Sequence, residues 1–299
     1  MAKPQVGDLI PLFKKEPYFR PADWLPLPKL TSEDQKIVGL HAVWPHDSNF
    51  CAVQVEGAYT VDWGDGSSPQ NYASGATAYH VFDYDDLEGT ECSRGYRQAI
   101  VTITPQSGQN LTSVNFAVKH NQAGLADRYS TGWLDVKAAG ANIATFLFGS
   151  PMPLVFNAML EIFEFIGSNV IVNFAGMFAG CYSLQSIPQL DTSEGTNFGG
   201  MFDGCYSLQS IPQLDTSSGE NFSGMFNYCF SLSTAALLGT STNISYQNCR
   251  LSRQALVDIF NNLATVTGKT ITITGNWGAA DLSASDRDIA TNKGWTIAG

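Results

Sequence analysis

The chain has 299 residues, enough for roughly two or three domains of ordinary size. Hydrophobic residues make up 44% and charged residues 14% of the sequence, which favours a strand-rich or repeat protein and excludes a disordered chain. The net charge is −11 and no basic cluster exceeds Lys14-Lys15, so nucleic acid and anionic membrane surfaces are excluded as partners. We expect no membrane insertion and no signal peptide, because no apolar run is long enough for either.

Residues 1–35 form the first predicted unit, an extended proline-rich arm. Six prolines in this stretch exclude a single helix or a central strand. Large apolar side chains interrupt the prolines, whereas a plain linker would be polar. The candidates for anchoring a partner are Phe13, Phe19, Trp24 and Leu25. Two interpretations stay open: the arm lies on a partner's surface, or it packs on its own domain.

Residues 36–120 form the second predicted unit, a β-sandwich. Apolar and polar residues alternate over 51–56, 59–63 and 98–105, and Asp65-Gly66 is a strong turn signal. Several short strands separated by turns are typical of an immunoglobulin-like sandwich.

The second unit also resembles the PKD (polycystic kidney disease) domain, an immunoglobulin-like sandwich. The similarity rests on the W-G-D-G turn at residues 63–66, the segment at 79–84 and the strand at 96–103. The resemblance implies a structural role for Asp62, Trp63 and Asp65, whose carboxylates tie the turn. Calcium binding by Asp62 and Asp65 is the alternative.

A 24-residue repeat defines the third predicted unit, residues 160–250. MFAGCYSLQSIPQLDTSEGTNFGG at 177–200 is followed by MFDGCYSLQSIPQLDTSSGENFSG at 201–224, and a third copy decays after Met225. Stacked turns can bury an apolar side that one turn cannot bury alone, so equivalent residues should form interior ladders. The predicted ladders are Leu184, Leu208 and Leu232, and Cys181, Cys205 and Cys229. We expect the thiols to be buried and reduced, with disulfides between neighbouring turns as the alternative.

This repeat resembles the BspA-type leucine-rich repeat, with its M-F-x-x-C-x-S-L-x-x-I-P-x-L-D-T-S pattern. Residues 121–159 are then a connecting and N-terminal capping segment, and residues 251–299 form the C-terminal cap. An amphipathic helix with Ser252 as its N-cap and a short helix from Asp286 to Lys293 are expected there. The predicted fold is therefore mainly β: a PKD-like sandwich followed by a short leucine-rich-repeat solenoid with a helical C-terminal cap.

Asp191 and Asp215 occupy the same repeat position and are the one candidate catalytic pair. Two carboxylates on adjacent turns could lie at the separation that retaining glycosidases use. Asp-Thr-Ser after a strand is also ordinary turn chemistry, which is the interpretation we favour. The four histidines are scattered, no C-x-x-C pair is present, and no cofactor or metal site is predicted.

The arm, the W-G-D-G sandwich and the BspA-type repeats together resemble a tailed-bacteriophage virion protein of the fibre, tail or decoration type. The resemblance implies a non-enzymatic component located in the virion, with the arm anchored to the particle. Its expected partners are other virion proteins, sister subunits in a homo-oligomer (a trimer is one candidate) and a host-surface glycan or protein. A glycan-degrading phage enzyme and a bacterial surface adhesin are the alternatives.

Overall fold

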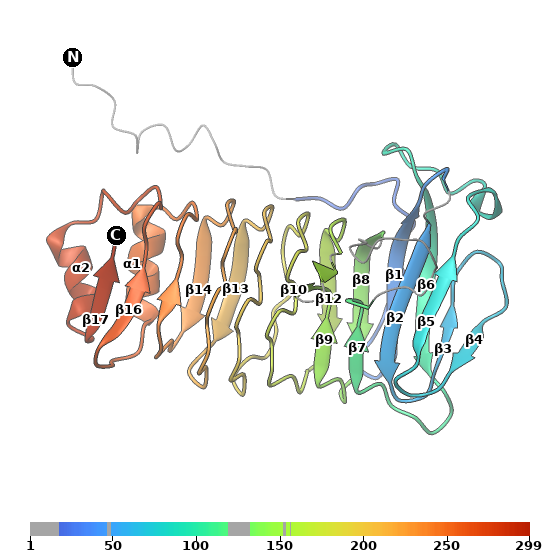
Figure 1. Ribbon diagram of the computed structural model, residues 1–299, viewed down its shortest axis with the longest axis horizontal. Helices are drawn as coiled ribbons and strands as arrows, with labels where there is room; N and C mark the ends of the chain where they lie inside the picture. The colour runs from blue at the N-terminus through green and yellow to red at the C-terminus, as the bar shows by residue number, and fades with distance from the viewer. Residues whose placement is uncertain (1–17, 47–48, 119–131, 152–153, 156) are drawn as a thin grey trace, which may run out of the picture.

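The computed structural model describes residues 18–46, 49–118, 132–151, 154–155 and 157–299. Within these residues the protein is mainly β, with five sheets and two α-helices. Figure 1 shows an elongated molecule in which strands follow one another from β4 (Gln70–Tyr72) at one end to β17 (Trp295–Ala298) and the helices at the other.

Two sheets build the end of the molecule that holds the first strands. The larger has the order β12-β8-β1-β6-β3-β4 and the smaller the order β5-β2-β7-β9. Their remaining strands are β1 (Lys36–Val43), β2 (Phe50–Glu56), β3 (Tyr59–Asp62), β5 (Thr77–Val81), β6 (Arg97–Pro105), β7 (Ser113–Asn115), β8 (Trp133–Ala139), β9 (Thr145–Leu147) and β12 (Ile162–Ile166). Side chains from both sheets, such as Val53 and Val101, share one buried cluster. The alternation seen in the sequence therefore marks strands with one face in this core.

The sheets cross the predicted unit boundaries. Strand β8 lies in the segment expected to be a connection, yet it pairs antiparallel with β1. Strand β12 belongs to the predicted repeats and pairs parallel with β8, with Phe163 opposite Val136. One buried cluster then runs from Ile37 to Trp295. The two parts are thus joined by shared sheets and a shared core.

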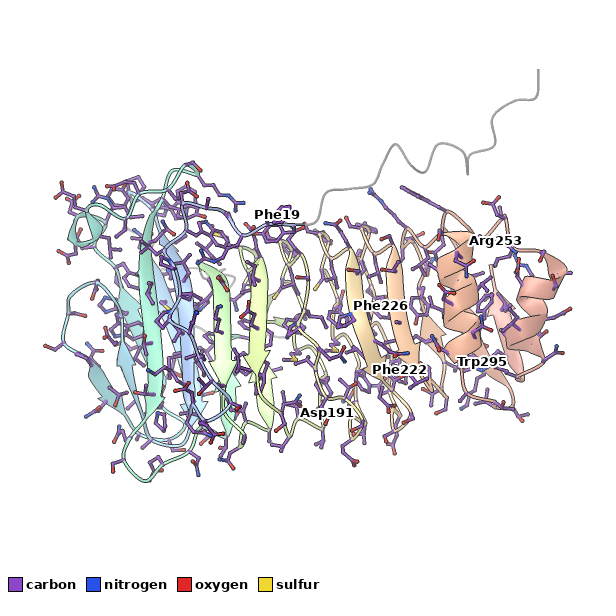
Figure 2. The ribbon with its side chains drawn as sticks, turned by 180° about the vertical axis from the view of Figure 1, so that it is seen from behind. Phe19, Asp191, Phe222, Phe226, Arg253 and Trp295 are labelled. Carbon is purple, nitrogen blue, oxygen red and sulfur yellow. The ribbon has the colours of Figure 1, made fainter. Side chains whose placement is uncertain are left out.

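The repeats stack in a 24-residue register. Parallel bridges join Asn173 to Asn197 and Asn197 to Asn221. Two ladders of three rings show the same step. Neighbouring centroids are 5.3 Å apart along Phe174, Phe198 and Phe222, and 5.7 and 5.8 Å apart along Phe178, Phe202 and Phe226. Phe222 and Phe226 are labelled in Figure 2. The leucine ladder Leu184, Leu208 and Leu232 is fully buried.

Short strands accompany these turns. Strand β13 (Ser210–Asp215) pairs parallel with β14 (Thr234–Leu238), with Ile211 opposite Ala235. Strands β10 (Ser150–Pro151) and β11 (Leu154–Val155) form a small antiparallel pair. The adjacent turns are therefore connected by backbone bonds as well as by side-chain ladders.

The cysteines form a buried ladder of free thiols. Cys181, Cys205 and Cys229 occupy equivalent positions, and Cys249 lies in the turn that follows. The Cys205 thiol donates to the Phe178 carbonyl at 3.2 Å, and Cys229 repeats this with Phe202 at 3.1 Å. Burial raises the pKa of each of these thiols, to about 12 at Cys249. Thiols that stay protonated are poor nucleophiles, so the ladder acts as packing.

Two helices and a parallel sheet close the stack at its C-terminal end. Helix α1 (Arg253–Asn262) begins at the predicted N-cap Ser252, whose side chain accepts from the Ala255 amide. Helix α2 (Ala284–Thr291) begins with a capping box between Ser283 and Asp286. Both Asp286 oxygens accept from Arg253, which ties the two helices together. The sheet beside them has the order β15-β16-β17, with β15 (Ile244–Ser245) and β16 (Lys269–Thr272).

Truncating the leucine ladder should destabilise the protein far more than a surface change beside it. Leu208→Ala leaves a void between two occupied turns and should lower the free energy of unfolding by ~2–5 kcal/mol. The matched control is Gln213→Ala on the exposed face of β13, which should cost under ~0.5 kcal/mol. Urea denaturation measures both. Equal losses at the two positions would contradict the ladder.

The buried thiols should resist alkylation while the protein is folded. Cys181, Cys205 and Cys229 are enclosed and have raised pKa values, so a thiol reagent should modify them only in denaturant. Mass spectrometry of labelled peptides, with and without denaturant, gives the comparison. An oxidised pair among the three in protein purified from cytoplasm would contradict the packing role.

Candidate functional site

The described part of the arm packs on the chain's own sheet, which agrees with the second of the two interpretations left open for residues such as Trp24 and Leu25. Trp24 is 2% exposed, and its indole N–H donates to the Tyr96 hydroxyl at 2.9 Å. The Leu25 amide donates to the buried Gln98 side chain. The physical reason is that Gln98 on β6 and Tyr96 just before it offer a polar and an aromatic partner that these residues fit. Of the other two predicted anchors, Phe19 is 72% exposed and Phe13 lies outside the described residues.

Charged groups fasten the arm at two points. Arg20 Nε donates to Asp135 Oδ2 at 2.7 Å, and the guanidinium groups of Arg20 and Arg94 lie 5.5 and 5.3 Å from the Trp24 ring. Glu161 accepts from Arg94 and from the Tyr18 hydroxyl. Burial raises the pKa of Asp135 despite its partner Arg20. These contacts hold Tyr18, Arg20 and Trp24 against the chain's own sheet, whereas Phe19 stays exposed.

The W-G-D-G turn is a self-contained structural unit. Asp62 Oδ1 accepts from the Gly64 amide and Asp65 Oδ1 from the Ser67 amide, each at 3.0 Å. Trp63 is fully buried and stacks on His80 with centroids 5.0 Å apart. Figure 1 places this turn between β3 and β4, at the far end from the helices.

The second oxygen of Asp65 is also engaged, since it lies 2.5 Å from His80 Nε2. Burial alone would raise the pKa of Asp65, but hydrogen bonds from Ser67 and His80 outweigh it, and the pKa is lowered. No cluster of three or more potential metal ligands occurs within the described ranges. Asp62 and Asp65 therefore each accept a hydrogen bond within the turn, and Asp65 also contacts His80.

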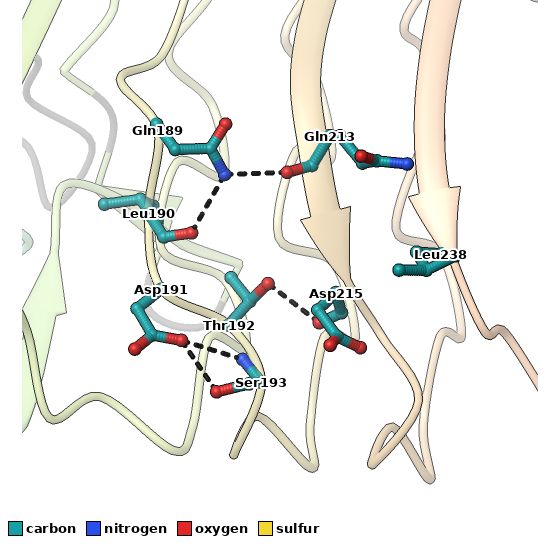
Figure 3. Close-up of a pocket in the computed structure, with 8 residues that line it drawn as sticks. All are labelled: Gln189, Leu190, Asp191, Thr192, Ser193, Gln213, Asp215 and Leu238. Atoms are coloured by element: carbon teal, nitrogen blue, oxygen red, sulfur yellow. Dashed lines mark hydrogen bonds between the residues drawn. The ribbon is translucent and has the colours of Figure 1, made fainter.

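Asp191 and Asp215 line a shallow pocket on the lower edge of the stack (Figures 2 and 3). Asp191 Oδ1 accepts from the Ser193 amide at 3.2 Å and hydroxyl at 2.7 Å, and Asp215 repeats this with Ser217 at 3.0 and 2.7 Å. Hydrogen bonds from Ser193 lower the pKa of Asp191. A general acid needs a raised pKa, and two residues with copied surroundings lack the asymmetry of an acid and nucleophile pair.

An exposed aromatic strip was missed by the sequence reasoning. It consists of the half-buried Tyr182 and the exposed Tyr206, Tyr228 and Phe230. Tyr206 comes just before β13, at the opposite end of that strand from Asp215, and Phe230 comes just before β14. Tyr206, Tyr228 and Phe230 are 42%, 57% and 43% exposed. Ring centroids are 4.8 Å apart for Tyr182 and Tyr206, and 5.7 Å apart for Tyr206 and Phe230. The strip is the largest run of exposed aromatics that the repeat register produces in the described residues.

A sequence signal for the strip existed. An aromatic residue follows the ladder cysteine in all three copies, at 182, 206 and 230. The 24-residue period alone does not show that this position faces solvent, because buried and exposed residues recur at the same spacing.

Comparison with known proteins gives one partial match. Residues 155–247 match a family described as "Mycoplasma protein of unknown function, DUF285", which covers less than half of the chain. No curated protein matches, and no solved structure matches. The match coincides with the stacked turns and with the strip. Neither helix in the described part of the chain has the length and apolarity to cross a membrane.

Removing the buried tryptophan of the arm should destabilise the whole protein. Trp24→Ala empties a site between Tyr96 and two guanidinium groups and should cost ~3–5 kcal/mol. Phe19→Ala is the matched control, since its ring is exposed, and should cost under ~0.5 kcal/mol. Thermal unfolding followed by circular dichroism reports both. A Trp24 variant as stable as the parent would restore the arm to the role of a partner anchor.

Proposed function

We propose that this protein is a non-enzymatic structural and binding component of a tailed-bacteriophage virion, of the fibre, tail or capsid-decoration type. The observation that carries the binding role is the exposed aromatic strip on a stack of nearly identical turns. Large apolar side chains are costly to expose, and contiguous exposed patches mark interaction surfaces. The non-enzymatic role rests on Asp191 and Asp215, which are both tied into their own turns.

The finer fold assignment belongs to the same proposal. We assign the first two sheets to a PKD-like immunoglobulin sandwich, supported by the bonded W-G-D-G turn and by the buried Trp63. We assign the 24-residue turns to BspA-type leucine-rich repeats, supported by parallel bridges at that spacing. Helices α1 and α2 then form the cap that an open solenoid end requires.

The attachment to the particle is proposed for the part of the arm before Trp24. Phe19 is the described aromatic residue there that remains available. Other virion proteins and sister subunits are the proposed partners, and a host-surface glycan or protein is the proposed ligand of the stack. The excess negative charge disfavours phosphate-rich partners.

Labelling of virions tests the location. Gold-conjugated antibodies against the folded protein should decorate purified particles at one fixed position in electron micrographs. Protein that is missing from purified particles but present on the surface of intact bacterial cells would replace the proposal with the adhesin alternative.

Incubation with polysaccharide tests the absence of enzymatic activity. Purified protein should leave host capsular polysaccharide at its original size, because neither aspartate has the environment of a general acid. Size-exclusion chromatography of the polymer gives the readout. Shortening by the parent protein that is lost in Asp191→Asn/Asp215→Asn would instead establish the glycan-degrading alternative.

A further inference from the structure

One residue of the aromatic strip is in a backbone conformation that disfavours it. Gly180 and Gly204 have φ values of +72° and +79°, and Tyr228 occupies the same repeat position in the next turn with φ +58°. A residue with a side chain is strained in this region, because its Cβ atom crowds the following carbonyl oxygen. Tyr228 is 57% exposed, and its ring contact with Phe230, at 5.8 Å, recovers at most an amount similar to that strain. A strained and exposed aromatic residue beside other exposed aromatics points to a ligand.

Three rings of the strip stack face to face. Tyr182 and Tyr206 are parallel within 5°, and Tyr206 and Phe230 within 17°, so each ring covers a face of its neighbour. Ring edges carry the positive part of the aromatic quadrupole and attract oxygen lone pairs. The hydroxyls of the exposed Tyr206 and Tyr228 add donors and acceptors. Three residues after Tyr182 and Tyr206, the Gln209 side chain donates to Gln185 at 3.1 Å, so one pair of amides also joins these two turns.

The backbone along the strip is already paired. The Ser207 amide donates to the Tyr182 carbonyl at 3.1 Å, and the Ser183 amide donates to Ala158 one turn earlier. An extended peptide gains most of its affinity on a surface of this kind by pairing with free backbone groups. These bonds leave few such groups for a peptide, so a polymer with its own hydroxyl groups fits better.

The charge of the surface selects a neutral polymer. The four side chains of the strip carry no charge, and Asp203, whose carbonyl accepts from Gly180, lies three residues before Tyr206. The whole chain carries −11 charges, which repel polyanions. Arg250 follows Cys249 as Tyr206 and Phe230 follow the preceding ladder cysteines, and its guanidinium lies over the Trp277 ring, 5.3 Å from the centroid. The four strip residues themselves therefore offer an acidic polysaccharide no cation.

We infer that Tyr182, Tyr206, Tyr228 and Phe230 bind a neutral, hydroxyl-rich polysaccharide that lies along the stack and crosses one turn after another. This inference rests on the proposed function and names the ligand class of its stack. Successive contacts at 4.8 and 5.7 Å suit a repeating ligand, because each turn offers the same group again.

Affinity electrophoresis in native gels tests the inference. The gels contain dextran, galactomannan or arabinogalactan as neutral probes, or alginate as an acidic probe. At least one neutral polymer should retard the protein, and alginate should not. Migration unchanged by all three neutral polymers, or retardation by alginate alone, would overturn the inference.

Variants locate the site. Tyr206→Ala and Phe230→Ala should each weaken retardation by about tenfold or more in apparent affinity. Tyr79→Ala, which removes an aromatic ring that is 49% exposed on β5, is the matched control and should bind as the parent does. If Tyr206→Ala and Phe230→Ala bind like the control, the polymer lies elsewhere and the inference is wrong.

Tyr228→Gly separates binding from folding. It restores the residue type of the two preceding turns at a positive φ, so the melting temperature should not fall, while the apparent affinity should fall several-fold. Unchanged affinity would remove Tyr228 from the site.

Virion labelling separates a failure of this inference from a failure of the proposed function. A protein found on particles that binds none of the neutral polymers keeps the proposed function and loses this inference. A protein that binds them but is absent from particles keeps this inference and loses the proposed virion location.

Discussion

The stacking of 24-residue turns in one register is the constraint on which the rest of the structure depends. One turn exposes its apolar side, and only a neighbouring turn with the same residues at the same places can cover it. The phenylalanine ladder ending at Phe222 and the leucine ladder through Leu208 both satisfy this condition. The same register also aligns residues that face water. A surface strip such as the one through Tyr206 is therefore a direct consequence of the way the core is filled.

A stack has two open ends, and the chain covers each by different means. At one end β12 continues into the larger sheet by pairing with β8, so the sheets act as the first layer of the stack. At the other end two capped helices cover the last strands, and the ion pair between Arg253 and Asp286 joins them. Tyr18 bonds to Glu161, the residue just before β12, so the arm is attached where sheets and stack meet. Arm, sheets and stack are thus one packed unit over the described residues.

Local pattern and repetition predicted much of this arrangement, and tertiary pairing explains the rest. The repeat spacing, the strand-rich character and the Ser252 cap follow from residue order alone. The pairing of β12 with β8 does not, because a parallel pair of distant strands leaves no local signal. Trp24 was ambiguous for another reason: a buried arm and a partner-binding arm require the same apolar residues. Only the Tyr96 hydroxyl, 72 residues away, decides between them.

The strip was missed because turn positions lack the alternation that separates inside from outside in a strand. At such positions the informative feature is a residue that departs from the local backbone preference, here the preference for glycine at positive φ. Two copies place glycine where φ is positive, and the third places Tyr228 there. Its edge-to-face contact with Phe230, at 5.8 Å, recovers about 0.5–1.5 kcal/mol at most. That gain is similar to the strain, so packing within the chain gives no net reason for a large exposed ring at this position. The inferred polysaccharide ligand would supply the reason.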